Sequence, residues 1–160
     1  MLHAAPTGLF TWDYTVYEDD TPIAFIDMSW WRERGEVQIA GVTFQVYRES
    51  LLAGRFVLQS GDQVLARAEK PSAFFRAFTV EADGRRMELR ALSWWTRSFG
   101  LFEGGRQVGS IRPKGWLTRK AVINLPSDLF LPVRVFLFWL VLILWRRAAQ
   151  SSHGAAGAGS

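Results

Sequence analysis

The sequence contains no cysteine and only two histidines, His3 and His153, among its 160 residues. Without cysteine there can be no disulfide, no thiolate nucleophile and no cysteine-ligated zinc. Both histidines lie in terminal segments, so the folded part has no imidazole for a Ser-His-Asp triad or a general base. Neither GxGxxG nor a phosphate-binding loop occurs. Hydrolases that use only carboxylates stay open, but spacing singles out no such pair, and we expect a non-enzymatic protein without metal or cofactor.

The amino-terminal segment also lacks the features of a secretory signal. The first ten residues, MLHAAPTGLF, have neither a basic segment nor a long apolar one, so we expect a cytoplasmic protein. A length of 160 residues with 49% hydrophobic and 14% aromatic residues fits one domain with a packed core. We place that domain at residues 1–149. The small and polar residues 150–160 predict a disordered tail.

Negative charge is scarce in the second half of the chain. Residues 1–80 hold 7 Lys and Arg against 10 Asp and Glu, a balance of −3, whereas residues 81–160 hold 12 against 5, a balance of +7. This asymmetry indicates an anionic partner, either phospholipid headgroups or nucleic acid. A solvated basic face without any partner explains it equally well.

Alternation of apolar and polar residues with period two recurs along most of the chain and is typical of half-buried strands. The first such segment has Phe10, Trp12, Tyr14 and Val16 on one face, and the next has Ala24, Ile26, Met28 and Trp30. A bulge or a turn is predicted at Gly41, and hairpin turns are predicted at Asp83-Gly84 and Gly104-Gly105. The acidic run 18–20 could hold a divalent cation, but a solvated turn is the simpler interpretation. About eleven strands with short spacing predict a closed barrel or a sandwich.

One apolar run dominates the end of the sequence. A helix over 129–149, capped by Ser127 or Asp128, would be apolar all round in its central part and must be covered on every side. A barrel with this helix in its lumen meets that requirement. The alternative is an integral membrane protein with one transmembrane helix at 129–147 and a cytoplasmic β domain, although the uncharged run is short for a span. The run consists of Val135, Phe136, Leu137, Phe138, Trp139, Leu140, Val141, Leu142, Ile143, Leu144 and Trp145.

The order of these segments over residues 40–149 resembles the tubby C-terminal-like superfamily, which includes LURP-one-related proteins and phospholipid scramblases. The segments that carry the resemblance are QVYRES, RFVLQSGDQVLARAEKP, FTVEADGRRMELRA, GLFEGGRQVGSIRP and the apolar helix. The resemblance implies an all-β fold with one helix, in which about twelve antiparallel strands close round a hydrophobic C-terminal helix. It also implies binding of acidic phospholipid, or scrambling of lipids. The acidic calcium cluster proposed beside the scramblase helix is absent, because only Asp128 lies nearby.

A lipid or anion site is predicted between the last strands, where basic residues flank a tryptophan. Lys and Arg can hold phosphate by charge-assisted hydrogen bonds, and tryptophan suits a headgroup boundary. We therefore expect a binding module or adaptor, peripheral at the inner membrane surface, with a nucleic-acid-associated barrel as the weaker alternative. One tryptophan of each pair, Trp30-Trp31 and Trp94-Trp95, should point outward from a strand. The predicted site residues are Arg112, Lys114, Trp116, Arg119 and Lys120.

Overall fold

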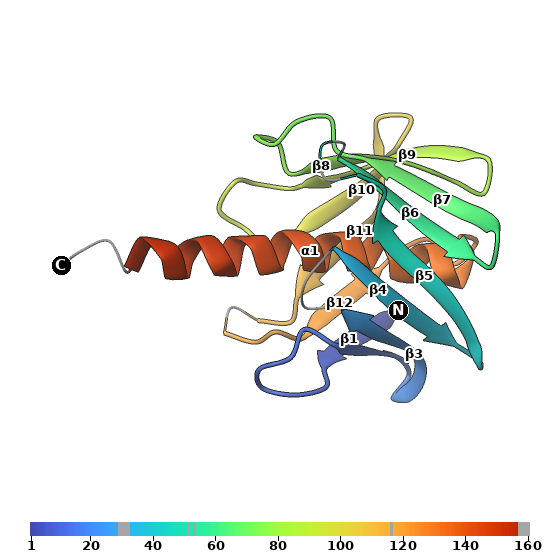
Figure 1. Cartoon of the computed structure of the whole chain (residues 1–160), viewed down its shortest axis with the longest axis horizontal. Helices are drawn as coiled ribbons and strands as arrows, with labels where there is room; N and C mark the ends of the chain where they lie inside the picture. The colour runs from blue at the N-terminus through green and yellow to red at the C-terminus, as the bar shows by residue number, and fades with distance from the viewer. Residues whose placement is uncertain (29–32, 51, 53, 116, 157–160) are drawn as a thin grey trace.

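The computed structural model is a closed antiparallel barrel of twelve strands with one C-terminal helix (Figure 1), which confirms the predicted fold class. It describes residues 1–28, 33–50, 52, 54–115 and 117–156. Every strand pairs with its neighbours in sequence, and β1 pairs with β12 to close the sheet. The strands are β1 (Leu2–Pro6), β2 (Tyr14–Glu18), β3 (Thr21–Met28), β4 (Arg34–Ile39), β5 (Val42–Arg48), β6 (Arg55–Ser60), β7 (Gln63–Glu69), β8 (Ala77–Ala82), β9 (Arg85–Ala91), β10 (Phe99–Glu103), β11 (Arg106–Pro113) and β12 (Ala121–Asn124).

Alternate residues of the strands point into the barrel, as the sequence pattern predicted. Ala24, Ile26 and Met28 of β3 are buried, for example, while Asp27 between them is exposed. The predicted first strand was wrong at its start, because β2 begins only at Tyr14 and Phe10 is 92% exposed. Strand β1 was missed altogether. Its five residues include two alanines and a proline, which have little strand propensity, and it forms because β2 and β12 pair with its two edges.

One end of the barrel, which we call the turn end, is closed by two-residue hairpin turns. They lie at residues 19–20, 40–41, 61–62, 83–84 and 104–105. In the predicted turn at Asp83-Gly84 both backbone φ angles are positive, 53° and 69°, as a type I′ hairpin requires. The predictions at Gly41 and at Gly104-Gly105 are confirmed in the same way. Asp19 and Asp20 of the acidic run also form a two-residue turn with positive φ.

The helix α1 (Leu131–Ala156) runs through the lumen from the turn end and leaves at the opposite end (Figure 1). Every residue from Val135 to Trp145 is buried, with at most 7% exposure. The ring centroids of Trp139 and Phe56 lie 5.9 Å apart, and those of Phe138 and Tyr14 lie 5.4 Å apart. The barrel thus encloses the uncharged run 135–145, which is the apolar centre of the transmembrane alternative at 129–147. Among the described helical residues, no stretch has both the length and the hydropathy of a membrane span.

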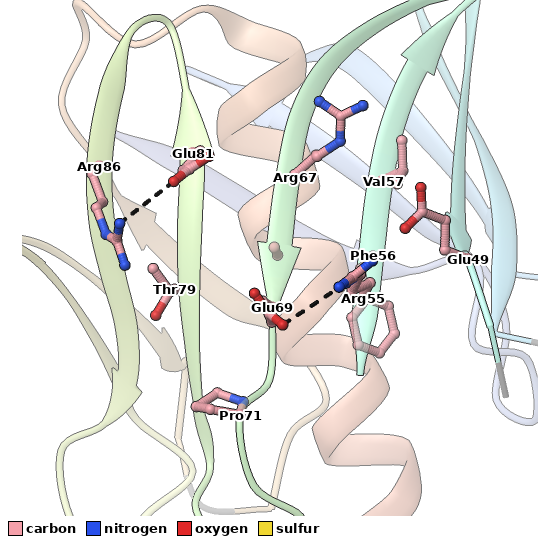
Figure 2. A pocket seen from close by; sticks show the side chains of 11 residues that line it. Glu49, Arg55, Phe56, Val57, Arg67, Glu69, Pro71, Thr79, Glu81 and Arg86 are labelled. Carbon is pink, nitrogen blue, oxygen red and sulfur yellow. Dashed lines mark ion pairs between the residues drawn. The ribbon is translucent and has the colours of Figure 1, made fainter. Parts of the chain in front are cut away.

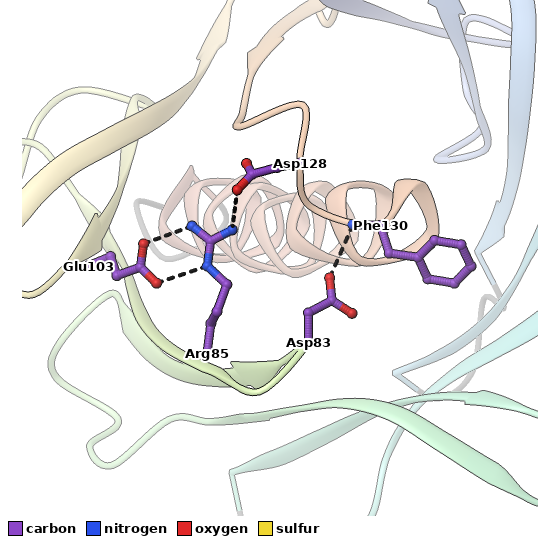
Figure 3. A network of polar contacts seen from close by, with 5 residues as sticks. All are labelled: Asp83, Arg85, Glu103, Asp128 and Phe130. Carbon is purple, nitrogen blue, oxygen red and sulfur yellow. Dashed lines mark hydrogen bonds and ion pairs between the residues drawn. The ribbon is translucent and has the colours of Figure 1, made fainter.

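The start of α1 is fixed by a polar network at the turn end (Figure 3). Arg85 donates two hydrogen bonds to Glu103, of 2.8 and 2.7 Å, and one of 3.0 Å to Asp128. The Phe130 N–H donates to the carboxylate of Asp83, and the Phe130 carbonyl accepts from the first turn of the helix. The predicted cap at Ser127 or Asp128 was wrong, because Phe130 holds the capping position and Asp128 pairs with Arg85 instead.

The helix also extends beyond its predicted end. It continues through residues 150–156, so the predicted disordered tail is wrong for that part, and residues 157–160 lie outside the described chain. Residues Ala148 to Gln150 are good helix formers, and no proline interrupts them. The hydroxyls of Ser151 and Ser152 donate back to helix carbonyls at 2.9 and 2.8 Å, so these side chains are satisfied within the helix.

Candidate functional site at the loop end

The opposite end of the barrel, which we call the loop end, has longer connections. They span residues 7–13, 29–33, 49–54, 70–76, 92–98 and 114–120, and α1 emerges between them (Figure 1). Each of these connections has five to seven residues, whereas each hairpin turn at the turn end has two. Loops that are longer than the reversal of the chain requires often form binding surfaces.

Large apolar side chains are exposed in these loops. Of the twelve exposed large hydrophobic residues in the described chain, nine lie at the loop end. Scattered single exposures are ordinary on a protein surface, but a ring of them around one end is not. We call this set the loop crown; it comprises Leu9, Phe10, Leu52, Phe74, Phe75, Leu92, Trp94, Trp95 and Leu117.

Trp94 and Trp95 show how the crown differs from the sequence prediction. The pair was expected in a strand with one ring outward, but both residues lie in the 92–98 loop, with 79% and 72% exposure. Their ring centroids are 4.3 Å apart. Trp30 and Trp31, the other predicted pair, lie outside the described residues. The prediction failed because the alternation of β9 stops at Ala91, where the chain leaves the sheet.

The half-buried side chain of Arg76 holds two of the crown loops in place. Arg76 donates to the carbonyls of Ser93, Trp94 and Thr96 at 2.7, 3.1 and 3.1 Å, so it links the 70–76 and 92–98 loops. Hydrogen bonds from a charged donor are stronger than neutral ones and fix the geometry of a loop. The exposed rings of the 92–98 loop are therefore presented on a supported backbone.

Arg119 supports the 7–13 loop in the same manner. It donates to the carbonyl of Leu9 at 2.9 Å and to that of Thr11, and its guanidinium lies 4.7 Å from the centroid of the Trp12 ring. Its own carbonyl accepts from the Tyr14 hydroxyl at 2.9 Å. Burial raises the pKa of Tyr14, so this hydroxyl stays protonated as a donor.

Inside the crown lies a second ring, the cationic collar, made of half-buried or buried basic residues. Strand alternation explains it, because each collar residue outside α1 occupies the next inward position beyond the buried residues of the adjoining strand. Val46 of β5 leads to Arg48, for example, and Ala68 of β7 leads to Lys70. The collar comprises Arg48 at the end of β5, Lys70, Arg76, Arg97 and Arg119 in the loop-end connections, and Arg146 and Arg147 of α1.

The collar meets one inward carboxylate in the described residues, that of Glu33. Its two oxygens accept from Arg48 at 3.1 Å and from Arg147 at 2.6 Å. On the far side of α1, the Trp145 indole donates to the Arg97 carbonyl at 3.0 Å, and the Arg97 guanidinium lies 4.6 Å from that ring's centroid. Arg97 is half-buried and Arg146 is buried, and this burial lowers the pKa of both side chains.

The structure separates the predicted anion-binding residues into two kinds. Arg112, Lys114 and Lys120 are exposed at the loop end, as a surface site requires. Arg119 is half-buried and bonded to the 7–13 loop, so it supports the surface rather than facing a ligand. Trp116 lies outside the described residues. Sequence reasoning missed the collar, whose members are far apart in sequence and meet only when the barrel closes.

The two ends of the barrel carry opposite charge. The described residues of the loop-end connections hold six Lys and Arg against three Asp and Glu, a balance of +3, before Arg146 and Arg147 of α1 are added. The turn-end connections, including residues 125–130, hold five Asp and no Lys or Arg, a balance of −5. The barrel is therefore polarised along its axis, with the apolar crown at the positive end.

Several concave regions lie on the described surface, and two of them bear on ligand binding. A groove of about 620 Å³ crosses the outside of β6 to β9 (Figure 2), where Arg55 pairs with Glu69 at 3.8 Å and Arg86 with Glu81 at 3.7 Å. Its charges balance and its pairs are exposed, so it favours no ligand of one sign. A cleft of about 410 Å³ lies between the 7–13 loop and α1, lined by Phe10, Trp12, Arg119, Arg146, Ala149, Gln150 and His153.

No protein-family model, curated protein or solved structure matches the chain. The resemblance to tubby-like proteins therefore stays a prediction. In the described part of the chain, no group of three or more His, Asp or Glu is placed to bind a metal ion. The assignment of a function rests on the loop end itself.

Proposed function

We propose that this protein is a non-enzymatic binding module that docks its loop end on a membrane surface containing anionic phospholipid. One observation carries the proposal: exposed aromatic and aliphatic side chains ring the end of the barrel at which positive charge is concentrated. Aromatic rings gain free energy at the boundary between headgroups and hydrocarbon, and each Lys or Arg close to an anionic surface adds about 1 kcal/mol.

The charge polarity of the barrel gives the proposed docking its orientation. An anionic surface attracts the loop end and repels the five aspartates of the turn end. The crown loops linked by Arg76 carry Phe74, Phe75, Trp94 and Trp95, which form its densest aromatic group. The same features explain why an anionic bilayer is a better partner than a nucleic acid, which offers charge but no extended apolar layer.

Sedimentation with lipid vesicles tests the proposal. We expect binding to vesicles of phosphatidylcholine mixed with phosphatidylglycerol, weaker binding at high salt, and little binding to phosphatidylcholine alone. Replacing Trp94 and Trp95 together by Ala should weaken binding about tenfold or more, because half-burying each ring contributes about 1 kcal/mol. Val42→Ala, which shortens an exposed apolar side chain at the turn end, is the matched control and should change nothing.

Two results would contradict the proposal. One is unchanged vesicle binding after the double tryptophan substitution, with the circular dichroism spectrum intact. The other is absence of binding to the mixed vesicles together with salt-sensitive binding to oligonucleotides, which would favour the nucleic-acid alternative.

A further inference from the structure

One sector of the cationic collar holds more positive charge than its carboxylate can balance. Arg48 and Arg147 pair with the Glu33 carboxylate, and Lys70 lies just beyond the end of β7. Strand register brings Arg48 and Lys70 together. Arg48 pairs with Phe56 and lies 6.0 Å from its ring, Phe56 pairs with Ala68, and Lys70 is the next inward position after Ala68. Burial lowers the pKa of Lys70, and the charges of Arg147 and Arg48 lower it further. Among the described residues, these three cations lie round one carboxylate, a balance of +2.

The neighbouring acidic residues do not change this balance. Glu49 follows Arg48 in the chain and therefore points to the other face of the sheet, where it lines the outer groove with Arg55 and Glu69. Glu33 already uses both of its oxygens for Arg48 and Arg147. A half-buried excess of like charge is unfavourable, and a bound anion would relieve it.

Anchoring of α1 accounts for only part of the cluster. The pairs of Glu33 with Arg147 and Arg48 tie the emerging helix to β4 and β5. Lys70 has no part in that anchor. Its ammonium donates to the backbone carbonyl of Ser72 within its own loop, and two ammonium protons remain for other acceptors.

We propose that Arg48, Lys70 and Arg147 form a binding subsite for a phosphate group, and that a dianionic phosphate monoester suits it better than a monoanionic diester. Arg147 and Arg48 are 36% and 25% exposed and Lys70 is half-buried, so solvent reaches the cluster. Leu52, Phe74 and Phe75 belong to the two loops beside it. In its lipid form this inference rests on the proposed function, because a headgroup phosphate would enter the subsite while the crown side chains lie at the membrane interface.

The experiment compares vesicles of phosphatidylcholine mixed with phosphatidic acid, a monoester, or with phosphatidylglycerol, a diester. We expect about tenfold tighter binding to the phosphatidic acid vesicles, the gain of one additional charged hydrogen bond. Lys70→Met keeps the aliphatic stem and should abolish this preference, and so should Arg147→Gln. Lys114→Met removes the same charge from an exposed site at the same end and should weaken binding to both vesicles by the same factor.

A second arm uses inorganic phosphate in place of lipid. We expect it to shift amide resonances around residues 48, 70 and 147 in an NMR titration of the full chain, and to do so less in Lys70→Met. Equal binding of the protein to both kinds of vesicle would overturn the lipid form of the inference. A Lys114→Met variant that loses the preference as fully as Lys70→Met would overturn it as well. Either result would leave the proposed function standing. Phosphate shifts without vesicle binding would assign the subsite to a free phosphate compound and overturn the proposed function. No phosphate shifts at these positions would overturn the subsite.

Discussion

At the scale of single residues, Trp139 shows how completely the helix depends on the barrel. Its side chain is fully buried, with the Phe56 and Phe136 rings 5.9 Å away. Gly35 provides the space beside it, since a Cβ there would lie 3.3 Å from the indole nitrogen and 2.4 Å from the Asp27 carbonyl oxygen. The lumen is therefore closely packed around the Trp139 side chain.

Trp139→Asp should unfold the whole domain. The substitution removes a large buried ring, at about 3–5 kcal/mol, and adds a buried charge without a partner, at several kcal/mol more. Together these costs match the whole stability of a typical domain, about 5–15 kcal/mol. Circular dichroism should report loss of the β spectrum. Trp95→Asp, at an exposed site, is the control and should leave the spectrum unchanged; a folded Trp139→Asp protein would contradict a helix packed in the lumen.

At the scale of elements, the start of α1 depends on the Arg85 network at the turn end. Arg85 holds the β9 end against Glu103 of β10 and Asp128 of the connection before the helix. The hydrogen bonds from Arg85 lower the pKa of Glu103. A carboxyl whose pKa is lowered by folding stabilises the fold above its unfolded pKa, and this contribution is lost as the pH falls through its folded pKa.

Glu103→Gln should therefore lower stability at neutral pH and matter little in acid. In urea unfolding, we expect a lower midpoint than wild type at neutral pH, and converging midpoints once the wild-type carboxyl is protonated below its folded pKa. Glu88→Gln is the matched control, because its pair with Arg90 is exposed and 3.6 Å long, and its midpoint should stay near wild type. A constant difference between Glu103→Gln and wild type across the acid range would contradict the pKa argument.

The same scale shows what the sequence could predict. Alternation and turn chemistry located most strands, since a buried face and a positive-φ turn each restrict which residues can stand there. The central helix followed from its uniformly apolar surface. Strand β1 and the last turns of α1 were not predicted, because their residues have weak intrinsic propensity for strand and helix. Strand β1 forms through its pairing partners, and the end of α1 is stabilised by local hydrogen bonds. Neither kind of contact is visible in a linear pattern.

At the scale of the whole molecule, the two ends of the barrel are chemically different. Short acidic turns close one end, while long loops with exposed aromatic residues surround the helix at the other. The candidate site was only partly predicted, because most of its residues lie far apart in the sequence. Arg112, Lys114 and Lys120 were found from their nearness in sequence, whereas the collar and the crown unite residues from Leu9 to Arg147, which only the closed barrel brings to one rim.

End-on docking of the loop end is the central claim, and the absence of cysteine makes it directly measurable. A single cysteine at Phe74, labelled with a polarity-sensitive fluorophore, reports on the loop end, and one at Asp62 reports on the turn end. On adding vesicles of phosphatidylcholine and phosphatidylglycerol, we predict a blue shift of the label at position 74 and none at position 62. A shift at position 62 alone, or at neither position while the protein binds the vesicles, would contradict docking by the loop end.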